Sequence, residues 1–221
     1  MFEAAAKDKA PIVLYFAEEG LDPIEAGNVL HDAELAKISA GNTLFVMVEY
    51  NGDRTPSFDD GSPVPTSKLL SPNLSRDYDV TKYPTFIVCD WFGNEHDRHT
   101  KVPAPSSLIK GIESVSDLMT KANDRLLGNL EEARKCLEDK DTRKFFKAAL
   151  KNFGYGYVGL EAAEETIKLY RATIDAARAE VDKILESRPE DGQKRLKDMS
   201  KDYRDTELES KIQDALDILK G

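Results

Sequence analysis

The sequence predicts an α/β domain followed by an all-helical domain. Apolar runs of strand length alternate with helical patterns up to about residue 120, and this alternation is typical of a sheet domain with flanking helices. From about residue 121 onward only helical periodicity remains. The chain of 221 residues is long enough for two modest domains, each with its own core. We therefore place the first domain at residues 1–120 and the second at residues 121–221.

The strand signals of the first domain begin with two continuous apolar runs, Ile12 to Phe16 and Thr43 to Tyr50. Unbroken runs of this length indicate strands that are covered on both faces of a sheet. The helical pattern between them has one apolar side, formed by Val29, Leu30, Leu35, Ala36 and Ile38. The order strand, helix, strand predicts a parallel crossover unit.

The rest of the first domain contains a long irregular segment and then two more strands. Residues 51–75 are expected to form a loop insertion, because Asn51 to Asn73 contains four prolines and two glycines. A third strand is predicted at Thr85 to Cys89, and Glu95 to Val102 can return beside it as an edge strand. A helix that begins at Pro105 is expected to close the domain.

The second domain is dominated by one heptad stripe. Apolar residues separated alternately by three and four positions continue over three repeats, which predicts a long helix from about residue 160 to residue 186. The stripe consists of Leu160, Ala163, Ile167, Tyr170, Ile174, Ala177, Val181 and Ile184. Two further stripes, Met119 to Leu137 and Leu208 to Leu219, are expected to cover it inside the chain.

The second domain also contains a weak internal repeat with an offset of about 50 residues. Leu137 with Phe146, Ala149 and Phe153 resembles Leu185 with Leu196, Met199 and Tyr203. Each copy predicts a long helix, a short turn and a second helix. The pattern resembles degenerate helix-turn-helix repeats of the tetratricopeptide kind, and a plain antiparallel bundle is an equal alternative.

Charge and hydropathy exclude several classes of partner. The chain carries 31 Lys and Arg against 41 Asp and Glu, a formal net charge of −10. This charge repels phosphate backbones and anionic lipid, so we expect no nucleic-acid partner.

No apolar run approaches the roughly 20 residues of a membrane helix, and a soluble chain without a membrane span is expected. With no secretory signal pattern, localisation stays open between the cytoplasm and an extracytoplasmic space reached with a signal peptide already removed. The oligomeric state is also open.

Neither the cysteines nor the histidines form a recognisable site. Cys89 and Cys136 have no metal-binding or paired spacing, and we expect two buried structural thiols. His96 and His99 lack further ligands at a suitable spacing, so surface histidines and no metal site are expected. The G-x-G-x-x-G string at residues 154–159 follows a helix instead of a strand, which favours an interhelical loop over a dinucleotide site.

Two segments of the first domain resemble the thioredoxin superfamily. Ile12 to Pro23 is similar to the active-site strand of that family, and Asp79 to Cys89 is similar to its cis-proline strand. The resemblance covers roughly residues 10–120. It implies a thioredoxin-like fold, in which helices flank a central mixed sheet, and a cis bond between Tyr83 and Pro84.

The missing cysteines remove the usual chemistry of that superfamily. Gly20 and Pro23 stand where its two cysteines would fall, and residues 18–24 contain no cysteine, serine or threonine nucleophile. The resemblance therefore implies a redox-inactive domain without catalytic residues or a cofactor. It leaves a surface that the superfamily uses to hold extended peptide. The residues implied in binding are Glu18, Glu19, Gly20, Asp22, Pro23, Tyr83 and Pro84.

These features predict an adaptor or chaperone-like module that binds a protein or peptide, and they argue against an enzyme. The alternative is a glutathione-transferase-like enzyme, because that family also joins a thioredoxin fold to an all-helical domain. The Glu-Ser or Asp-Ser pair that it places after its third and fourth strands is absent near Phe92 to His99. An endoplasmic-reticulum escort protein is disfavoured, because Asp217 to Gly221 does not form a retention signal.

Overall fold

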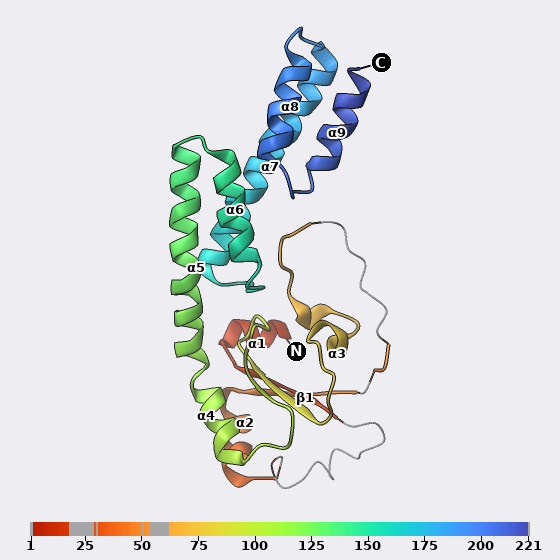
Figure 1. Ribbon diagram of the computed structural model, residues 1–221. Helices are drawn as coiled ribbons and strands as arrows, with labels where there is room; N and C mark the ends of the chain where they lie inside the picture. The colour runs from red at the N-terminus through yellow and green to blue at the C-terminus, as the bar shows by residue number, and fades with distance from the viewer. Residues whose placement is uncertain (1, 18–28, 30, 50, 54–61, 221) are drawn as a thin grey trace. The chain divides into compact units, whose positions relative to one another are not determined.

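The structure is a computed structural model that describes residues 2–17, 29, 31–49, 51–53 and 62–220. The chain divides into two compact units. The first comprises Met1–Ser57 and Thr66–Ala122, and the second comprises Phe58–Pro65 and Asn123–Gly221. Figure 1 follows the chain from its N-terminus to its C-terminus. Residues 62–65 group with the second unit, although we expected them in an insertion of the first domain.

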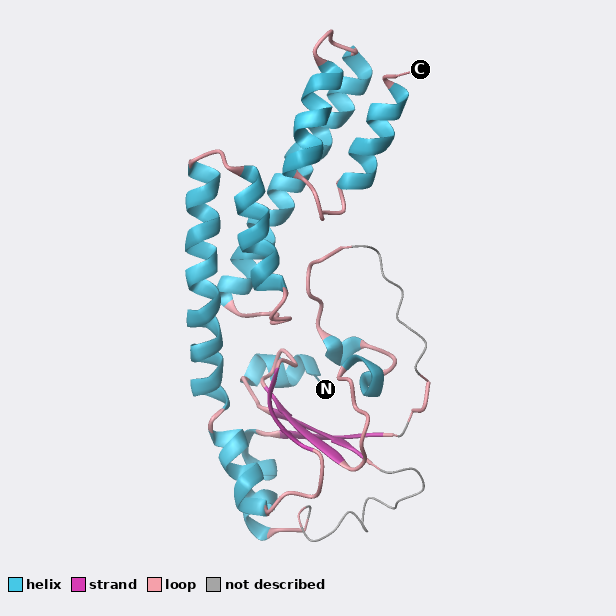
Figure 2. Cartoon of the chain, viewed as in Figure 1, coloured by secondary structure: helices cyan, strands magenta, loops and turns pink. Residues whose placement is uncertain are grey.

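The first unit is built on a four-stranded mixed sheet. Its strands are β1 (Ile12–Phe16), β2 (Leu44–Val48), β3 (Thr85–Cys89) and β4 (Glu95–His99). They lie in the order β2-β1-β3-β4, with β1 parallel to β2 and antiparallel to β3, and with β3 antiparallel to β4. Figure 2 shows this sheet together with the helices of the unit. The prediction of a mixed sheet flanked by helices, with a parallel crossover between its first two strands, is confirmed.

β1 and β3 form the buried centre of the sheet. Every residue of both strands is buried, because each strand has a neighbour on both sides. Leu14 pairs with Ile87 in the antiparallel register, and the neighbouring rings of Tyr15 and Phe86 stack with their centroids 4.6 Å apart. The Tyr83–Pro84 peptide bond just before β3 is cis, as expected.

The two edge strands differ from their predictions. β2 was expected to be covered on both faces, but most of its residues are half-buried and Met47 is 44% exposed. The reason is its position at the edge of the described sheet, where β1 is its only neighbour. β4 lies at the other edge, as predicted, and it ends at His99 instead of continuing to Val102.

Short helices complete the first unit. They are α1 (Phe2–Asp8), α2 (Ala33–Asn42), η2 (Lys68–Leu70), α3 (Leu74–Asp77) and α4 (Pro105–Glu113). α2 is capped by the Asp32 carboxylate, which accepts two backbone N–H bonds of its first turn. Val29 and Leu35 are buried as predicted. Ala36 of the predicted apolar side is exposed instead, and Leu30 lies outside the described residues.

The second unit is mostly helical. Its helices are α5 (Val115–Glu138), which begins in the first unit, α6 (Thr142–Phe153), α7 (Glu161–Ser187), α8 (Gly192–Asp202) and α9 (Glu209–Ile218). The long α5 turns into the shorter α6, and the long α7 turns into the shorter α8 (Figure 1). The chain therefore contains the long-short helix order twice, as the internal repeat predicts.

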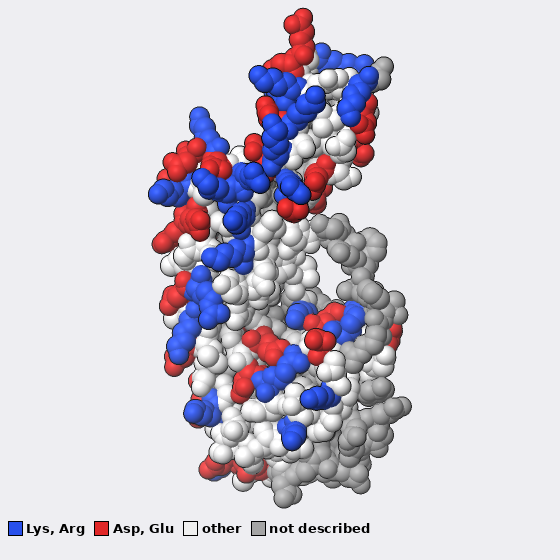
Figure 3. Space-filling view, viewed as in Figure 1, with Lys and Arg blue, Asp and Glu red and all other residues white. Residues whose placement is uncertain are grey.

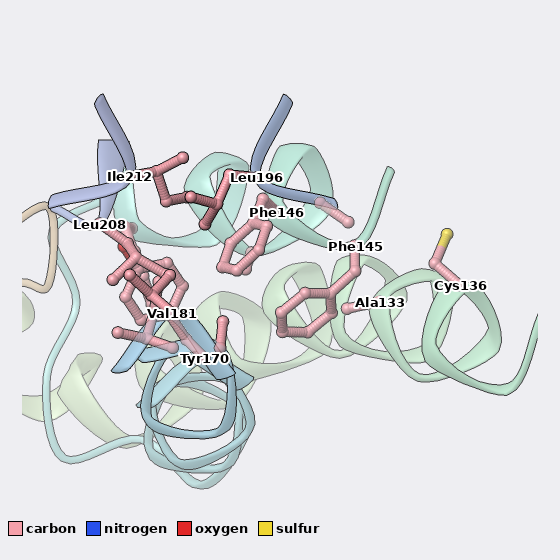
Figure 4. Close-up of a cluster of buried hydrophobic side chains, with 14 of the residues drawn as sticks. Ala133, Cys136, Phe145, Phe146, Tyr170, Val181, Leu196, Leu208 and Ile212 are labelled. Atoms are coloured by element: carbon pink, nitrogen blue, oxygen red, sulfur yellow. The ribbon is translucent and has the colours of Figure 1, made fainter. Parts of the chain in front are cut away.

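Every residue of the heptad stripe along α7 is buried, and the stripe from Ile167 to Ile184 belongs to the core of the second unit. At about 1.5 Å per residue this helix is about 40 Å long, so it needs apolar partners from several elements. Ala133 of α5, Phe146 of α6, Leu196 of α8 and Ile212 of α9 belong to the same core (Figure 4). Val64 also packs against it. The prediction that the stripe is covered within the chain is confirmed.

A buried polar network links the first three helices of this unit. The Asn152 side-chain amide on α6 donates to the Leu126 carbonyl oxygen of α5 at 3.0 Å and to Thr166 Oγ1 of α7 at 2.9 Å. Its carbonyl oxygen accepts a 2.8 Å bond from the Asn129 side chain of α5. Because buried polar groups are costly without partners, this network favours one register of the three helices.

Candidate functional site

The predicted peptide-binding residues are only partly within the described chain. Five of them lie outside the described residues, namely Glu18, Glu19, Gly20, Asp22 and Pro23. Tyr83 and Pro84 are described, and both are half-buried at the start of β3. The predicted set as a whole therefore remains a prediction.

The described surroundings of Pro84 are well defined. Thr85 is buried, and its hydroxyl donates a 2.7 Å hydrogen bond to the Lys82 carbonyl oxygen, which shapes the turn before β3. Phe16 pairs with Thr85 across the two central strands. The end of β1 therefore lies beside the beginning of β3, and Ala17 extends that end with a 3.4 Å hydrogen bond to Val48.

The thiols offer no nucleophile. The whole chain has two cysteines, and both are free and buried, as predicted. Burial raises the pKa of Cys89 far above its usual range, and desolvation together with the nearby Asp141 carboxylate raises the pKa of Cys136. Because the thiolate is the reactive form, neither side chain is activated near neutral pH.

The β3–β4 turn corrects the expectation of surface histidines. The His96 side chain is only 3% exposed, and its Nε2 lies 2.9 Å from Oδ2 of the fully buried Asp90. The same carboxylate accepts the backbone N–H bonds of Phe92 and Asn94. Gly93 completes the turn with φ of 89°, where a Cβ would lie 2.5 Å from the nearest Leu69 atom.

These contacts give the Asp90 cluster a structural role. A buried carboxylate needs several donors, and the turn supplies them. The described residues contain no group of three or more His, Cys, Asp and Glu side chains that could hold a metal ion.

A groove in the second unit is the strongest candidate site among the residues that the structure describes. It has a volume of about 700 Å³ and lies between α6 and the connection from α8 to α9. We call it the α6 groove. Its lining residues are Asp141, Arg143, Lys144, Phe146, Lys147, Leu150, Asp202, Arg204 and Asp205.

The floor of the α6 groove is apolar. Phe146 is 2% exposed, and its ring packs against those of Tyr170 and Tyr203 with centroid separations of 5.4 and 5.1 Å. Leu150 lies one helical turn further along α6 and is half-buried. The two side chains form a short apolar stripe at i, i+4 spacing along the groove.

The wall opposite α6 is held in place by hydrogen bonds. The Thr206 hydroxyl donates to the Tyr203 carbonyl oxygen at 2.7 Å, and the backbone N–H of Asp205 donates to the Glu209 carboxylate at 2.9 Å. The Tyr170 hydroxyl of α7 donates to the Glu207 carboxylate. This connection therefore has a defined conformation beside the groove.

The charges of the groove are distributed unequally. Asp141 caps α6 and forms a 2.8 Å ion pair with Lys144, whose hydrogen bond lowers the pKa of Asp141. Arg143, Lys147 and Arg204 form no ion pair with any residue that the structure describes. Figure 3 shows Lys and Arg side chains gathered over α6. The α6 wall is therefore cationic, whereas the opposite wall carries charges of both signs.

Sequence reasoning missed this groove, although α6 carries a signal. The helix has the sequence TRKFFKAALKNF, with four cationic residues and no acidic residue, in a chain of net charge −10. A smaller hollow of about 390 Å³ lies between α2 and β2. Its lining is Leu35, Ala36, Ser39, Ala40 and Phe45, without a charged group to orient a ligand.

None of the described helices combines the length and the low charge that a membrane span needs. Comparison of the chain with family models, with curated proteins and with solved structures finds no match.

Proposed function

We propose that this protein is a binding module that holds an extended segment of a partner protein and that its first unit is a redox-inactive thioredoxin-like domain. The four-stranded mixed sheet with flanking helices is compatible with that fold. Both cysteines are buried with raised pKa values, which supports a role without thiol chemistry.

The proposal rests on the size and the lining of the α6 groove. Its volume of about 700 Å³ falls within the usual range for ligand sites, about 300–1,000 Å³. The twelve residues of α6 span about 18 Å, the length of about five residues of extended chain. An apolar floor with charged walls suits a peptide, whose side chains can fill the floor while its backbone and polar groups remain near water.

The helix order supports a repeat-like origin for this groove. α5 with α6 and α7 with α8 are two hairpins of the same long-short order. We propose that they are degenerate helical repeats of the tetratricopeptide kind, which stack to present binding surfaces. A plain bundle requires no such similarity between its two halves.

Binding to the groove can be tested with a matched pair of variants. Peptides selected from a random display library against the full chain would be measured by calorimetry with the wild type, Leu150→Ser and Leu127→Ser. Leu150 lines the groove, whereas Leu127 is 38% exposed on α5 outside the groove lining. We expect Leu150→Ser to weaken binding about tenfold, since a buried Leu contributes about 1.5 kcal/mol or more.

Leu127→Ser should leave the affinity unchanged, and circular dichroism would verify that both variants are folded. Failure to select any peptide, or equal affinity for both variants, would overturn the proposal. Retention of the wild type on glutathione resin would instead favour the glutathione-transferase alternative.

A further inference from the structure

We propose that the partner segment is acidic and that Asp or Glu alternates with apolar residues along it. This inference rests on the proposed function, because it names the chemistry of the peptide that the α6 groove would hold. The cationic side chains of α6 would pair with the carboxylates, and the apolar side chains would lie on the groove floor.

α6 presents a row of exposed cationic side chains. Its exposed residues include Arg143, Lys147 and Lys151, which follow one another at i, i+4 and i+8. Like charges at this spacing destabilise a helix slightly, so the pattern does not serve helix stability. Arg143 and Lys147 line the groove, whereas Lys151 lies on the same row one turn beyond the lining. Unpaired cations beside an apolar floor are complementary to carboxylates.

The spacing of the cations along α6 matches the side-chain spacing of an extended peptide. Residues four apart on a helix rise by about 6 Å, because each residue rises about 1.5 Å. Side chains on one face of an extended peptide are two residues apart and therefore about 6.6–6.8 Å apart. A peptide that runs along α6 can thus place every second side chain near successive cations, while the intervening side chains face the other way.

The opposite wall restricts the orientation of such a peptide. Asp202 and Asp205 lie on that wall together with Arg204, and neither aspartate forms an ion pair with a described residue. These carboxylates would repel an acidic side chain that approached them. The acidic side chains should therefore turn toward Arg143 and Lys147 and away from Asp202 and Asp205, and removal of the Asp205 charge should strengthen binding.

The test uses three labelled ten-residue peptides in which Glu, Gln or Lys alternates with Leu and Ala. Fluorescence anisotropy with the full chain would give their affinities at low and moderate salt. We expect the Glu peptide to bind at least about tenfold more tightly than the Gln peptide, with affinity that falls as salt rises, and the Lys peptide to bind most weakly.

Charge variants locate the site. Arg143→Glu and Lys147→Glu should each weaken the Glu peptide about tenfold, because attraction to several carboxylates becomes repulsion. Asp205→Asn should tighten it a few-fold. Lys168→Glu is the matched control, because Lys168 is exposed on α7 and does not line the groove, and it should leave the affinity nearly unchanged.

The outcomes separate this inference from the proposed function. If all three peptides bind with equal affinity and Leu150→Ser weakens them, the groove binds peptide and the acidic preference is wrong. If peptides of every charge fail to bind, both proposals fail. If Lys168→Glu weakens the Glu peptide as much as Lys147→Glu, the proposed location is wrong. If poly(U) RNA or phosphatidylserine vesicles bind in a Lys147-dependent way while the Glu peptide does not, the partner is not an acidic peptide and the inference is overturned.

Discussion

The buried Tyr170 hydroxyl donates a hydrogen bond to the carboxylate of Glu207, which lies 37 residues further along the chain. Tyr170 is in the middle of the α7 stripe, whereas Glu207 is in the connection between α8 and α9. The bond therefore joins the core of the second unit to the wall of the α6 groove that carries Arg204 and Asp205.

The first prediction concerns this bond directly. Tyr170→Phe should keep the ring packing against Phe146 and Phe153 but leave the Glu207 carboxylate without its phenol donor. A hydrogen bond to a charged group contributes about 1.5–3 kcal/mol, and we expect a loss of that size in the free energy of unfolding. Urea denaturation measures it. An unchanged midpoint would show that the bond contributes nothing to stability.

The second prediction is the pH dependence of the same contact. Desolvation raises the pKa of Tyr170, and the hydrogen bond to Glu207 raises it further, whereas an unfolded tyrosine has a pKa of about 10. Below pH 10 both states keep the proton, so the contribution of Tyr170 to stability is fully present. Above pH 10 only the unfolded state releases the phenol proton of Tyr170. The free energy of unfolding therefore falls by up to about 1.4 kcal/mol per pH unit.

The measurement is the difference between the wild type and Tyr170→Phe, because Cys89, Cys136, Tyr78 and Tyr203 also have raised pKa values. The difference in unfolding free energy should be constant between pH 7 and pH 9 and should shrink above about pH 10. A constant difference up to pH 11 would contradict the assignment.

The elements that the sequence predicts well are those with a strong local period. The α7 stripe repeats every three to four residues. Its burial follows because a long apolar face of a helix needs apolar partners that shield it from water. The burial of β2 was overestimated, because an apolar run does not reveal whether its strand lies at the centre or the edge of a sheet. The position of His96 was missed because its buried partner Asp90 stands six residues earlier, beyond the turn.

The candidate site was harder to predict for a similar reason. The α6 groove exists only where α6 meets a connection about 60 residues further along the chain, and no local pattern contains both walls. The cationic composition of α6 was the one available signal, and it has meaning only beside an apolar floor. The predicted residues from Glu18 to Pro23 lie outside the described residues and remain a prediction.

The third prediction concerns the cysteines. We expect no insulin reduction above background, because the two thiols are buried and their raised pKa values keep them protonated. Both should react slowly with iodoacetamide in the native protein and fast in denaturant. Cys89→Ser should lower stability by about 1–3 kcal/mol, since it places a hydroxyl in the buried core, where the Tyr78 hydroxyl that Cys89 contacts already donates to the Gly93 carbonyl oxygen. Cysteine-dependent insulin reduction would contradict the proposal that the first unit is redox-inactive.

The last prediction tests the centre of the α7 stripe. Ile174 is 2% exposed, and Ile174→Asp would bury a carboxylate without a partner, at a cost of several kcal/mol against a typical total stability of about 5–15 kcal/mol. The second unit should unfold, with a loss of helical signal in circular dichroism. Ala172→Asp, at an exposed position two residues earlier on the same helix, is the matched control and should remain folded. If Ile174→Asp instead stays folded as a monomer and loses self-association in sedimentation, the stripe is an interface between chains and its packing inside the second unit is wrong.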